Sequence, residues 1–400
     1  MPAKERIWTK EYILLTVANF FVATNFYAQL SIGASFAIYG LGETETKAGV
    51  AAGLYVIGAL SARLIFSKYA RQSRFKLVLL IDIGAMVMFT ALHMTISGFV
   101  VFCAFRFLLG ATYGISSNIS MTIIALIIPA GRKGEGVAWY TMSQILGMAI
   151  GPFCAIYIMH SHGFTGAFLL LTLFTAIAFA ILFFIKQPAE ADQPLPVPAG
   201  EPAQETPKPP AAERGIWQVF ERSAVRIALL CVIIYFCNAN YQAFAPVFVT
   251  ESGAPALSSA IFLASAGAML AIRPIIGRLF DRSGPNMLIL FGLVSFTAGF
   301  VLIGQGVISL FIPAALFIGL GLSSIYGTTL TVVVSDSPRH RLNAANTTYF
   351  FSLDFGAAIG PVIGGSIAEY MGYSSMYFVC AAMIAACIPL YFGFIAKRRK

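Results

Sequence analysis

Arg273-Pro-Ile-Ile-Gly-Arg-Leu-Phe-Asp-Arg-Ser-Gly284 separates two long apolar runs in the second half of the chain. Gly277 permits two backbones to approach closely, and the final Ser-Gly pair is typical of a tight turn. Asp281 places a carboxylate between the guanidinium groups of Arg278 and Arg282. A charged turn between apolar runs indicates a loop at the edge of a membrane, and a short basic cytoplasmic loop is its simplest interpretation.

The order Gly-Arg-x-x-Asp-Arg-x-Gly in this stretch is more specific than a basic loop. It resembles the loop signature of the major facilitator superfamily, which in that family lies between helices 2 and 3 and again between helices 8 and 9. The resemblance implies an all-α membrane protein with 12 transmembrane helices in two pseudo-symmetric six-helix bundles. It also implies an inner gate that contains Gly277, Arg278, Asp281, Arg282 and Gly284.

An internal repeat of about half the chain agrees with this resemblance. A degenerate copy of the motif lies 210 residues earlier, where Arg63 corresponds to Arg273 and Arg71 stands in the place of Asp281. A second block matches at a separation of 209 residues. Its corresponding pairs are Gly110 and Gly319, Pro129 and Pro338, Arg132 and Arg341, Tyr140 and Tyr349, Gly147 and Gly356, Gly151 and Gly360, and Pro152 and Pro361.

The composition excludes a soluble globular protein. Hydrophobic residues make up 58% of the 400 residues and charged residues only 11%, whereas a soluble surface needs about twice that share of charge. Of the 26 Lys and Arg residues, Lys47 alone falls in an outer loop when the N-terminus is cytoplasmic. The positive-inside rule therefore predicts a multi-pass protein of the cytoplasmic (inner) membrane with both termini cytoplasmic. The positive net charge is thus explained by the basic cytoplasmic segments of a membrane protein, and we expect no nucleic-acid partner.

Twelve apolar runs are long enough to cross a bilayer, in two groups of six. They span about 12–38, 47–67, 77–96, 98–127, 137–159 and 163–185, and then 227–249, 256–277, 286–305, 307–334, 343–370 and 373–396. The proline-rich segment between the groups has too few apolar residues to form a hydrophobic core. We expect an N-terminal bundle at 1–186, a cytoplasmic linker with an interfacial helix at 187–224, and a C-terminal bundle at 225–400.

Polar and aromatic residues interrupt the first, fourth, seventh and tenth runs, which are related by the repeat. The corresponding helices line the central cavity in the family that the chain resembles. The pattern therefore predicts a substrate cavity, although each residue alone can instead form a hydrogen bond between helices. The candidates are Asn25, Tyr27, Gln29, Asn118, Asn238, Asn240, Tyr241, Gln242 and Tyr326.

Two charged residues inside apolar runs are candidates for proton coupling. Asp354 lies about twelve residues into its run, near mid-membrane at about 1.5 Å per residue, where desolvation favours the protonated carboxyl. Arg106 begins an Arg-x-x-x-Gly sequence that resembles the helix 4 motif of the family, and it must be paired or face water. The alternatives are a structural hydrogen-bond donor for Asp354 and a structural anchor for Arg106.

Gly147, Gly151 and Pro152 recur in the second half as Gly356, Gly360 and Pro361. Glycines four residues apart make a smooth helix face, and the prolines permit bending. The sequence resembles the helix 5 motif of efflux members of the superfamily. The fuller copy, with further glycines, lies in the eleventh run rather than the fifth, which weakens the inference of antiport.

These features predict a secondary active transporter that moves a small molecule, most simply by proton-coupled export of a drug-like compound or metabolite, a metallophore among them. Import of a small polar or anionic solute is the alternative. A membrane-embedded enzyme is a remote third, because the four His residues have no metal spacing and no nucleophile lies near a base. No filter sequence indicates a channel. We expect no cofactor, no metal, and a monomer in the lipid bilayer that exchanges substrate and protons.

Overall fold

The computed structural model describes residues 7–69, 75–129, 132–185, 215–218, 220–338 and 341–395. The predicted linker therefore lies mostly outside the described residues. The long helices are α1 (Lys10–Ser35), α2 (Glu45–Tyr69), α3 (Phe75–Leu92), α4 (Phe99–Ile127), α5 (Lys133–Phe183), α6 (Val225–Glu251), α7 (Pro255–Gly304), α8 (Phe311–Asp336) and α9 (Leu342–Leu390). Shorter helical turns are η1 (Phe36–Gly40), η3 (His93–Thr95), η5 (Gly215–Gln218), η6 (Ile308–Leu310) and η8 (Tyr391–Ile395).

Three of these helices are too long to cross a membrane once. α5, α7 and α9 contain 51, 50 and 49 residues, and a straight helix of that length would extend about 75 Å. Each is interrupted by a glycine with positive φ, at Gly163 (70°), Gly284 (70°) and Gly372 (84°). A side chain with a Cβ atom rarely adopts this backbone conformation, so glycine lets the chain turn there.

Ten segments of the described chain are long and apolar enough to cross a bilayer. Two of them, Glu135–Phe183 and Ala344–Gly393, contain the turns at Gly163 and Gly372. The predicted number of twelve is reached when each of these two counts as two crossings. The prediction of an all-helical membrane protein is confirmed.

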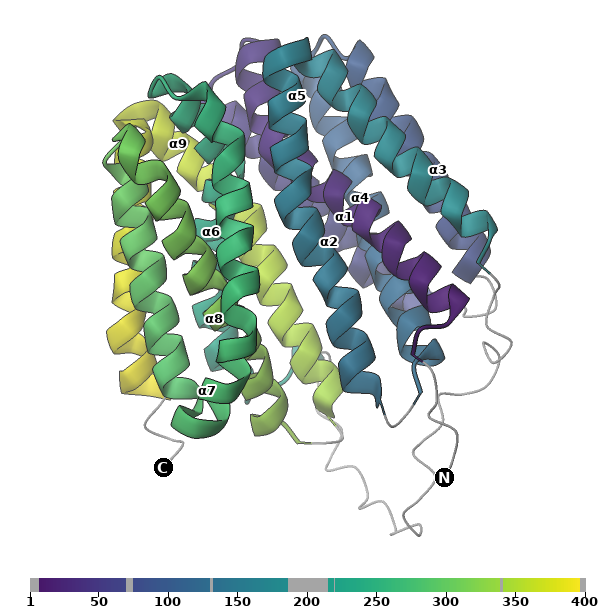
Figure 1. Cartoon of the computed structure of the whole chain (residues 1–400), viewed down its shortest axis with the longest axis vertical. Helices are drawn as coiled ribbons and strands as arrows, with labels where there is room; N and C mark the ends of the chain where they lie inside the picture. Colours follow the sequence, from purple (N-terminus) through teal and green to yellow (C-terminus); the bar gives the residue numbers. More distant parts are fainter. Residues whose placement is uncertain are drawn as a thin grey trace.

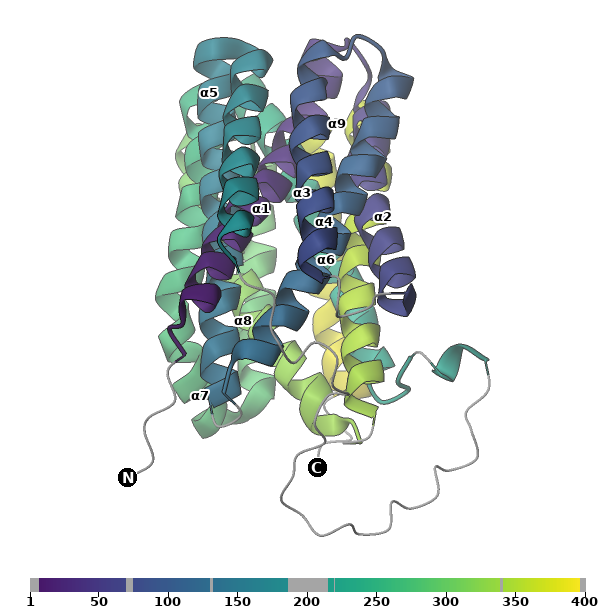
Figure 2. The same cartoon turned by 90° about the vertical axis from the view of Figure 1, so that its right-hand side faces the viewer.

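The helices pack in two groups, α1 to α5 and α6 to α9 (Figures 1 and 2). In the first group α1 packs against α5 and α2 against α4, and in the second α6 packs against α9 and α7 against α8. The main contacts between the groups join α2 with α9, α5 with α7, and α1 with α6. We refer to the two groups as the N-terminal and C-terminal bundles; the exact domain boundaries stay a prediction.

Glycines bring helices into backbone contact at positions related by the repeat. A Cβ atom on Gly151 of α5 would lie 2.3 Å from the carbonyl oxygen of Thr24 in α1. A Cβ atom on Gly360 of α9 would lie 2.4 Å from the carbonyl oxygen of Phe236 in α6. The four motif glycines thus pack one helix against another in each bundle, while bending at the two prolines stays a prediction. The second pair of packing glycines is Gly147, against Ala23 and Thr24, and Gly356, against Val232.

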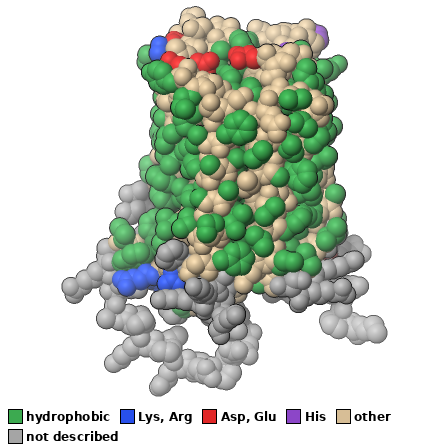
Figure 3. Space-filling model, turned by 90° about the vertical axis from the view of Figure 1, so that its left-hand side faces the viewer, with side chains coloured by type: hydrophobic (Ala, Val, Ile, Leu, Met, Phe, Trp, Pro, Cys, Tyr) green, Lys and Arg blue, Asp and Glu red, His purple; other side chains and the backbone are tan. Residues whose placement is uncertain are grey.

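Apolar side chains cover the side of the molecule between its two ends (Figure 3). Large hydrophobic residues are exposed there, among them Val100 at 80% and Ile81 at 66%. Carboxylates gather near one end, where Lys47 pairs with Glu43, and further Lys or Arg side chains lie near the other end (Figure 3). An exposed apolar belt of this kind is stable only in a bilayer. We call the end that carries Glu43, Glu45, Glu251 and Glu369 the acidic end.

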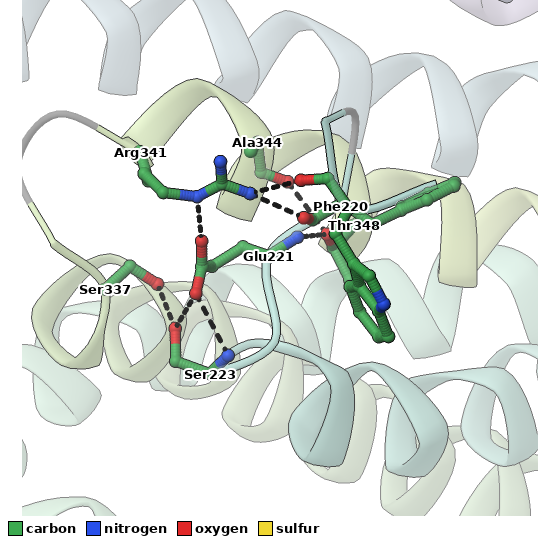
Figure 4. A network of polar contacts seen from close by, with 8 residues as sticks. Phe220, Glu221, Ser223, Ser337, Arg341, Ala344 and Thr348 are labelled. Carbon is green, nitrogen blue, oxygen red and sulfur yellow. Dashed lines mark hydrogen bonds and ion pairs between the residues drawn. The ribbon is translucent and has the colours of Figure 1, made fainter. Parts of the chain in front are cut away.

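A polar network binds the segment before α6 to the rest of the C-terminal bundle (Figure 4). The Arg341 guanidinium pairs with the carboxylate of Glu221 and donates to the carbonyl oxygens of Trp217 (2.6 Å) and Phe220 (2.8 Å). The Glu221 backbone N–H donates to Thr348 Oγ1 (2.8 Å), and Ser223 donates to the carboxylate from its N–H and its hydroxyl. The predicted interfacial helix is the single turn η5 in this region.

Replacing Glu221 with Gln is expected to destabilise the protein by about 1–3 kcal/mol at neutral pH, because Arg341 would lose its charged partner. Burial raises the pKa of Glu221, but hydrogen bonds from Arg341 and Ser223 outweigh burial and hold the pKa below its ordinary value. The stabilisation is therefore present above that ordinary value and is lost as the pH falls through the lower folded value. Thermal unfolding followed by tryptophan fluorescence at a series of pH values measures both effects.

The repeat supplies a matched control for this variant. Arg132, which corresponds to Arg341, pairs with Glu135 (2.8 Å), and Glu135 keeps 47% of its side chain exposed. Glu135→Gln should cost only about 0–1 kcal/mol, as exposed ion pairs do. Equal destabilisation by the two variants, or a Glu221→Gln effect that does not depend on pH, would contradict the prediction.

Candidate functional site

Hydrogen bonds join the two bundles at the acidic end. The Tyr39 hydroxyl donates to Glu251 Oε1 (3.0 Å), and the Thr46 backbone N–H donates to Glu369 Oε2 (3.0 Å). Further contacts between the bundles at this end join Tyr373 with Glu45, Thr46 with Ser366, and His160 with Ser258. The bundles are therefore closed against each other at the acidic end.

Backbone contact between α2 and α9 reinforces this closure. A Cβ atom on Gly49 would lie 2.0 Å from the carbonyl oxygen of Pro361, and one on Gly53 would lie 2.6 Å from that of Ala358. From the other side, a Cβ atom on Gly365 would lie 2.4 Å from the carbonyl oxygen of Glu45. No side chain fits at these positions while the bundles are closed.

An ion pair joins the same two helices further from the acidic end. Arg63 Nη1 of α2 lies 2.5 Å from Asp354 Oδ2 of α9, and Arg63 Nη2 lies 3.4 Å from Ser117 Oγ of α4. Arg63 follows Glu45 by eighteen residues, which corresponds to about 27 Å of helix. The side chains of Arg63 and Asp354 are 26% and 22% exposed. This ion pair crosses between the bundles.

Tyrosines from three helices lie near the pair. Tyr27 of α1, Tyr113 of α4 and Tyr326 of α8 each lie within electrostatic range of both Arg63 and Asp354. The structure thus brings three of the predicted site residues together, namely Tyr27, Tyr326 and Asp354. Their rings offer flat apolar faces and hydroxyl groups beside a pair of opposite charges.

Arg273 of α7 adds a second guanidinium near this group. It lies within electrostatic range of Tyr326 and is partly buried. Its repeat position corresponds to that of Arg63, so each bundle contributes one arginine from the same place in its fold. Among the described side chains, no carboxylate forms an ion pair with Arg273. The described charges around Tyr326 therefore comprise two arginines and one aspartate.

Arg106 lies elsewhere, inside the N-terminal bundle. It is fully buried, donates to the carbonyl oxygens of Gln29 (2.8 Å) and Ala51 (3.3 Å), and stacks on the ring of Tyr55 at 4.1 Å. Its Nη2 atom has no partner in the described structure. Gly33 leaves the space for it, because a Cβ atom there would lie 2.7 Å from the guanidinium carbon. A role in proton coupling stays a prediction for this residue.

The other predicted cavity residues are buried, except for Asn118, which is partly exposed on α4. The Tyr241 hydroxyl of α6 and Ser265 Oγ of α7 share a hydrogen bond of 2.9 Å. Asn240 packs against Gly364, and Asn25 lies 3.5 Å from Thr90 Oγ1 of α3. Buried side-chain oxygens without a partner in the described structure belong to Asn25, Gln29, Asn238, Asn240 and Gln242. Substrate contact stays a prediction for all of them.

The predicted gating stretch is helical up to Ser283, and the chain reverses at Gly284. The side chains of Arg278, Asp281 and Arg282, together with the surroundings of Gly277, lie outside the described residues. The sequence predicts a loop between the runs that end at about 277 and begin at about 286, whereas the turn is confined to Gly284, the residue of this stretch that has a positive φ. The gating role of this motif stays a prediction.

The described residues contain no group of three or more His, Cys, Asp or Glu side chains that could hold a metal ion. Arg63, like Tyr113 and Arg273, belongs to the site but was not among the predicted site residues. Two signals pointed to it: a charge inside an apolar run, and a basic partner at the same position of the repeat. Neither signal identifies Asp354 as its partner, because the two residues belong to different halves of the chain.

Comparison with known proteins agrees with this architecture. The family model described as Major Facilitator Superfamily matches residues 15–361 and 265–400. The staphylopine export protein of Staphylococcus aureus is 21% identical over 375 residues, which cover 88% of each chain. A Deinococcus radiodurans protein named for sugar efflux is 28% identical over 242 residues, and the match spans 59% of this chain and 59% of that relative.

A solved structure shows the same fold at low sequence identity. A POT family transporter in complex with a thioalcohol-conjugated peptide superposes with a TM-score of 0.79 at 13% identity. The match covers 97% of this chain and 96% of the other.

Proposed function

Because this chain belongs to the major facilitator superfamily and is therefore a multi-pass membrane transporter, we propose that it exports a small molecule in exchange for protons. The substrate is a drug-like compound or a metabolite, metallophores included. Two relatives with names that describe export or efflux favour this direction. The protein acts as a monomer in the cytoplasmic membrane.

The observation that carries this proposal is the ion pair between Arg63 and Asp354. Transport by alternating access requires contacts between the two bundles that form in one state and break in another. A carboxylate in such a contact binds its arginine most strongly when ionised, and a proton weakens the pair by removing the negative charge. Protonation of Asp354 therefore biases the separation of the bundles where the pair lies, which couples proton binding to the conformational change.

The orientation follows from the distribution of charge. The acidic end faces the outside, and the opposite end, with its Lys and Arg residues, faces the cytoplasm (Figure 3). The described state is closed on the outside through the contacts of Glu251 and Glu369. Tyr27, Tyr326 and Asp354 then face the path of a substrate that arrives from the cytoplasm, and Asn118 is a further proposed contact along this path.

Everted membrane vesicles test the function. An outward-pumping protein will move its substrate into such vesicles when a proton gradient, acidic inside, is imposed, and the substrate is found by screening amphipathic drugs and polar metabolites. We expect substrate-dependent loss of the gradient, followed with a pH-sensitive dye, only in vesicles that contain the protein. Uptake of the substrate by intact cells, with entry of protons in the same direction, would instead establish import.

A further inference from the structure

The ion pair between Arg63 and Asp354 joins the two bundles, and its two opposite charges can also bind a ligand. Both side chains are partly exposed, and both lie within electrostatic range of Tyr27, Tyr113 and Tyr326. Beyond Asp354, the hydrogen bond that Arg63 makes in the described structure is a long one, 3.4 Å to Ser117 Oγ. Each charged group can therefore exchange its partner for a ligand without breaking a larger network.

We propose that Arg63 and Asp354 bind the two ends of a zwitterionic amino-carboxylate substrate. The ammonium group of the ligand takes the place of Arg63 at Asp354, and its carboxylate takes the place of Asp354 at Arg63. The inference rests on the proposed transport function, because it names the substrate class of the same site.

Charge compensation favours a zwitterion over a ligand of one sign. A purely anionic ligand that binds Arg63 leaves the Asp354 carboxylate without a counter-ion, and a purely cationic ligand leaves the guanidinium without one. An unpaired charge in a site of restricted access to water is costly. A ligand that carries both charges replaces one ion pair by two.

The surroundings of the pair refine the substrate class. Tyr27, Tyr113 and Tyr326 lie within electrostatic range of both charged groups. Tyrosine faces accept an ammonium group or an aliphatic chain between two charged ends. Amino acids and their derivatives have this chemistry.

The linkage between substrate and proton follows from the same geometry. The groups that face Asp354 are Arg63 from α2, Tyr27 from α1, Tyr113 from α4 and Tyr326 from α8. A proton on Asp354 removes the negative charge that the ammonium group needs. Substrate and proton then compete for one carboxylate, which is the condition for exchange rather than cotransport. A purely anionic substrate would reverse this sign, since it frees Asp354 to bind a proton.

Three probes of equal chain length distinguish the ligand classes. Glutarate carries two carboxylates, cadaverine two ammonium groups and 5-aminovalerate one of each. Binding to the full-length protein in lipid nanodiscs is measured as thermal stabilisation, followed by the fluorescence of its three tryptophans. We expect 5-aminovalerate to bind at least about tenfold more tightly than either other probe, since it alone makes both charged contacts. Arg63→Gln and Asp354→Asn should each remove this preference, whereas Arg226→Gln at the exposed start of α6 should keep it.

If Arg63→Gln fails to fold, Arg63→Lys, which keeps the charge, is measured in its place. Equal or tighter binding of glutarate, or of cadaverine, would overturn the proposal in favour of a site for one sign of charge. So would the absence of binding by 5-aminovalerate to protein that unfolds cooperatively. Because binding is measured without a gradient, these results are independent of pH-driven transport: binding without transport would count against the proposed function, and transport without this preference against the site.

Discussion

Asp354→Asn is expected to abolish accumulation of substrate against a gradient while substrate exchange in the absence of a gradient persists. Asparagine keeps the volume of aspartate and can still accept from Arg63, but it does not titrate. Protonation then no longer changes the contact between α2 and α9. An imposed pH difference therefore cannot drive accumulation of the substrate. Reconstituted proteoliposomes measure both quantities, with substrate inside and outside for exchange and with a pH difference for accumulation.

Asp82 supplies the matched control. It is also a membrane-embedded aspartate, 6% exposed on α3, and its Oδ2 atom has no partner in the described structure. It belongs to the N-terminal bundle and does not contact α9 in any described hydrogen bond or ion pair. Coupling should survive in Asp82→Asn. Full pH-driven accumulation by Asp354→Asn would show that Asp354 has a structural role, and loss of coupling in Asp82→Asn alone would place the proton inside the N-terminal bundle.

Gly49→Ala is expected to open the acidic end. The new methyl group would lie 2.0 Å from the carbonyl oxygen of Pro361, which belongs to the other bundle, so closure requires a backbone shift. Overpacking of this kind costs about 1–3 kcal/mol, which changes a two-state population by about 5- to 150-fold. Spin labels on Ser97 and Met371, in a variant without native cysteines, should report longer distances between the bundles. Transport should fall, because the state closed at the acidic end becomes rare.

Gly58→Ala tests whether this effect is specific to the interface. A Cβ atom on Gly58 would lie 2.1 Å from the carbonyl oxygen of Phe107, and both residues belong to the N-terminal bundle. This variant should lose thermal stability without a change in the distance between the labels. An unchanged label distance in Gly49→Ala would contradict the assignment of Gly49 to the closing surface.

Much of the fold could be predicted because a membrane helix is indicated by a continuous apolar run in the sequence. Apolar runs ending at about 159 and 370 lie just before Gly163 and Gly372, where the structure turns. The repeat placed Gly151 and Gly360 at equivalent positions, and both bring their helices into backbone contact. The gating stretch differed, because helical hydrogen bonding continues to Ser283 despite its charges.

The site was only partly predictable for a physical reason. Asp354 stood out because a carboxyl inside an apolar run is costly, and this holds whatever its neighbours are. The partner of that carboxyl depends on how the two bundles dock, which no local pattern encodes. Polar residues such as Asn240 and Gln242 are ambiguous for the same reason, since a helix position does not reveal whether a neighbouring helix or water covers it.

Helices α2 and α9 each carry residues of the closing surface and one charged residue of the ion pair, at different positions along the helix. Gly49 and Gly53 on α2 pack against Pro361 and Ala358 on α9 to form the closing surface, and Arg63 lies ten residues beyond Gly53, about 15 Å along α2. Mutations of Arg63 therefore leave the closing surface of α2 intact. Substitutions at the pair change substrate recognition and proton coupling together, because both depend on the same carboxylate, whereas the closing surface is inherited unchanged. Protein engineers can therefore alter selectivity at Arg63 without rebuilding the closing surface, provided that Asp354 is kept.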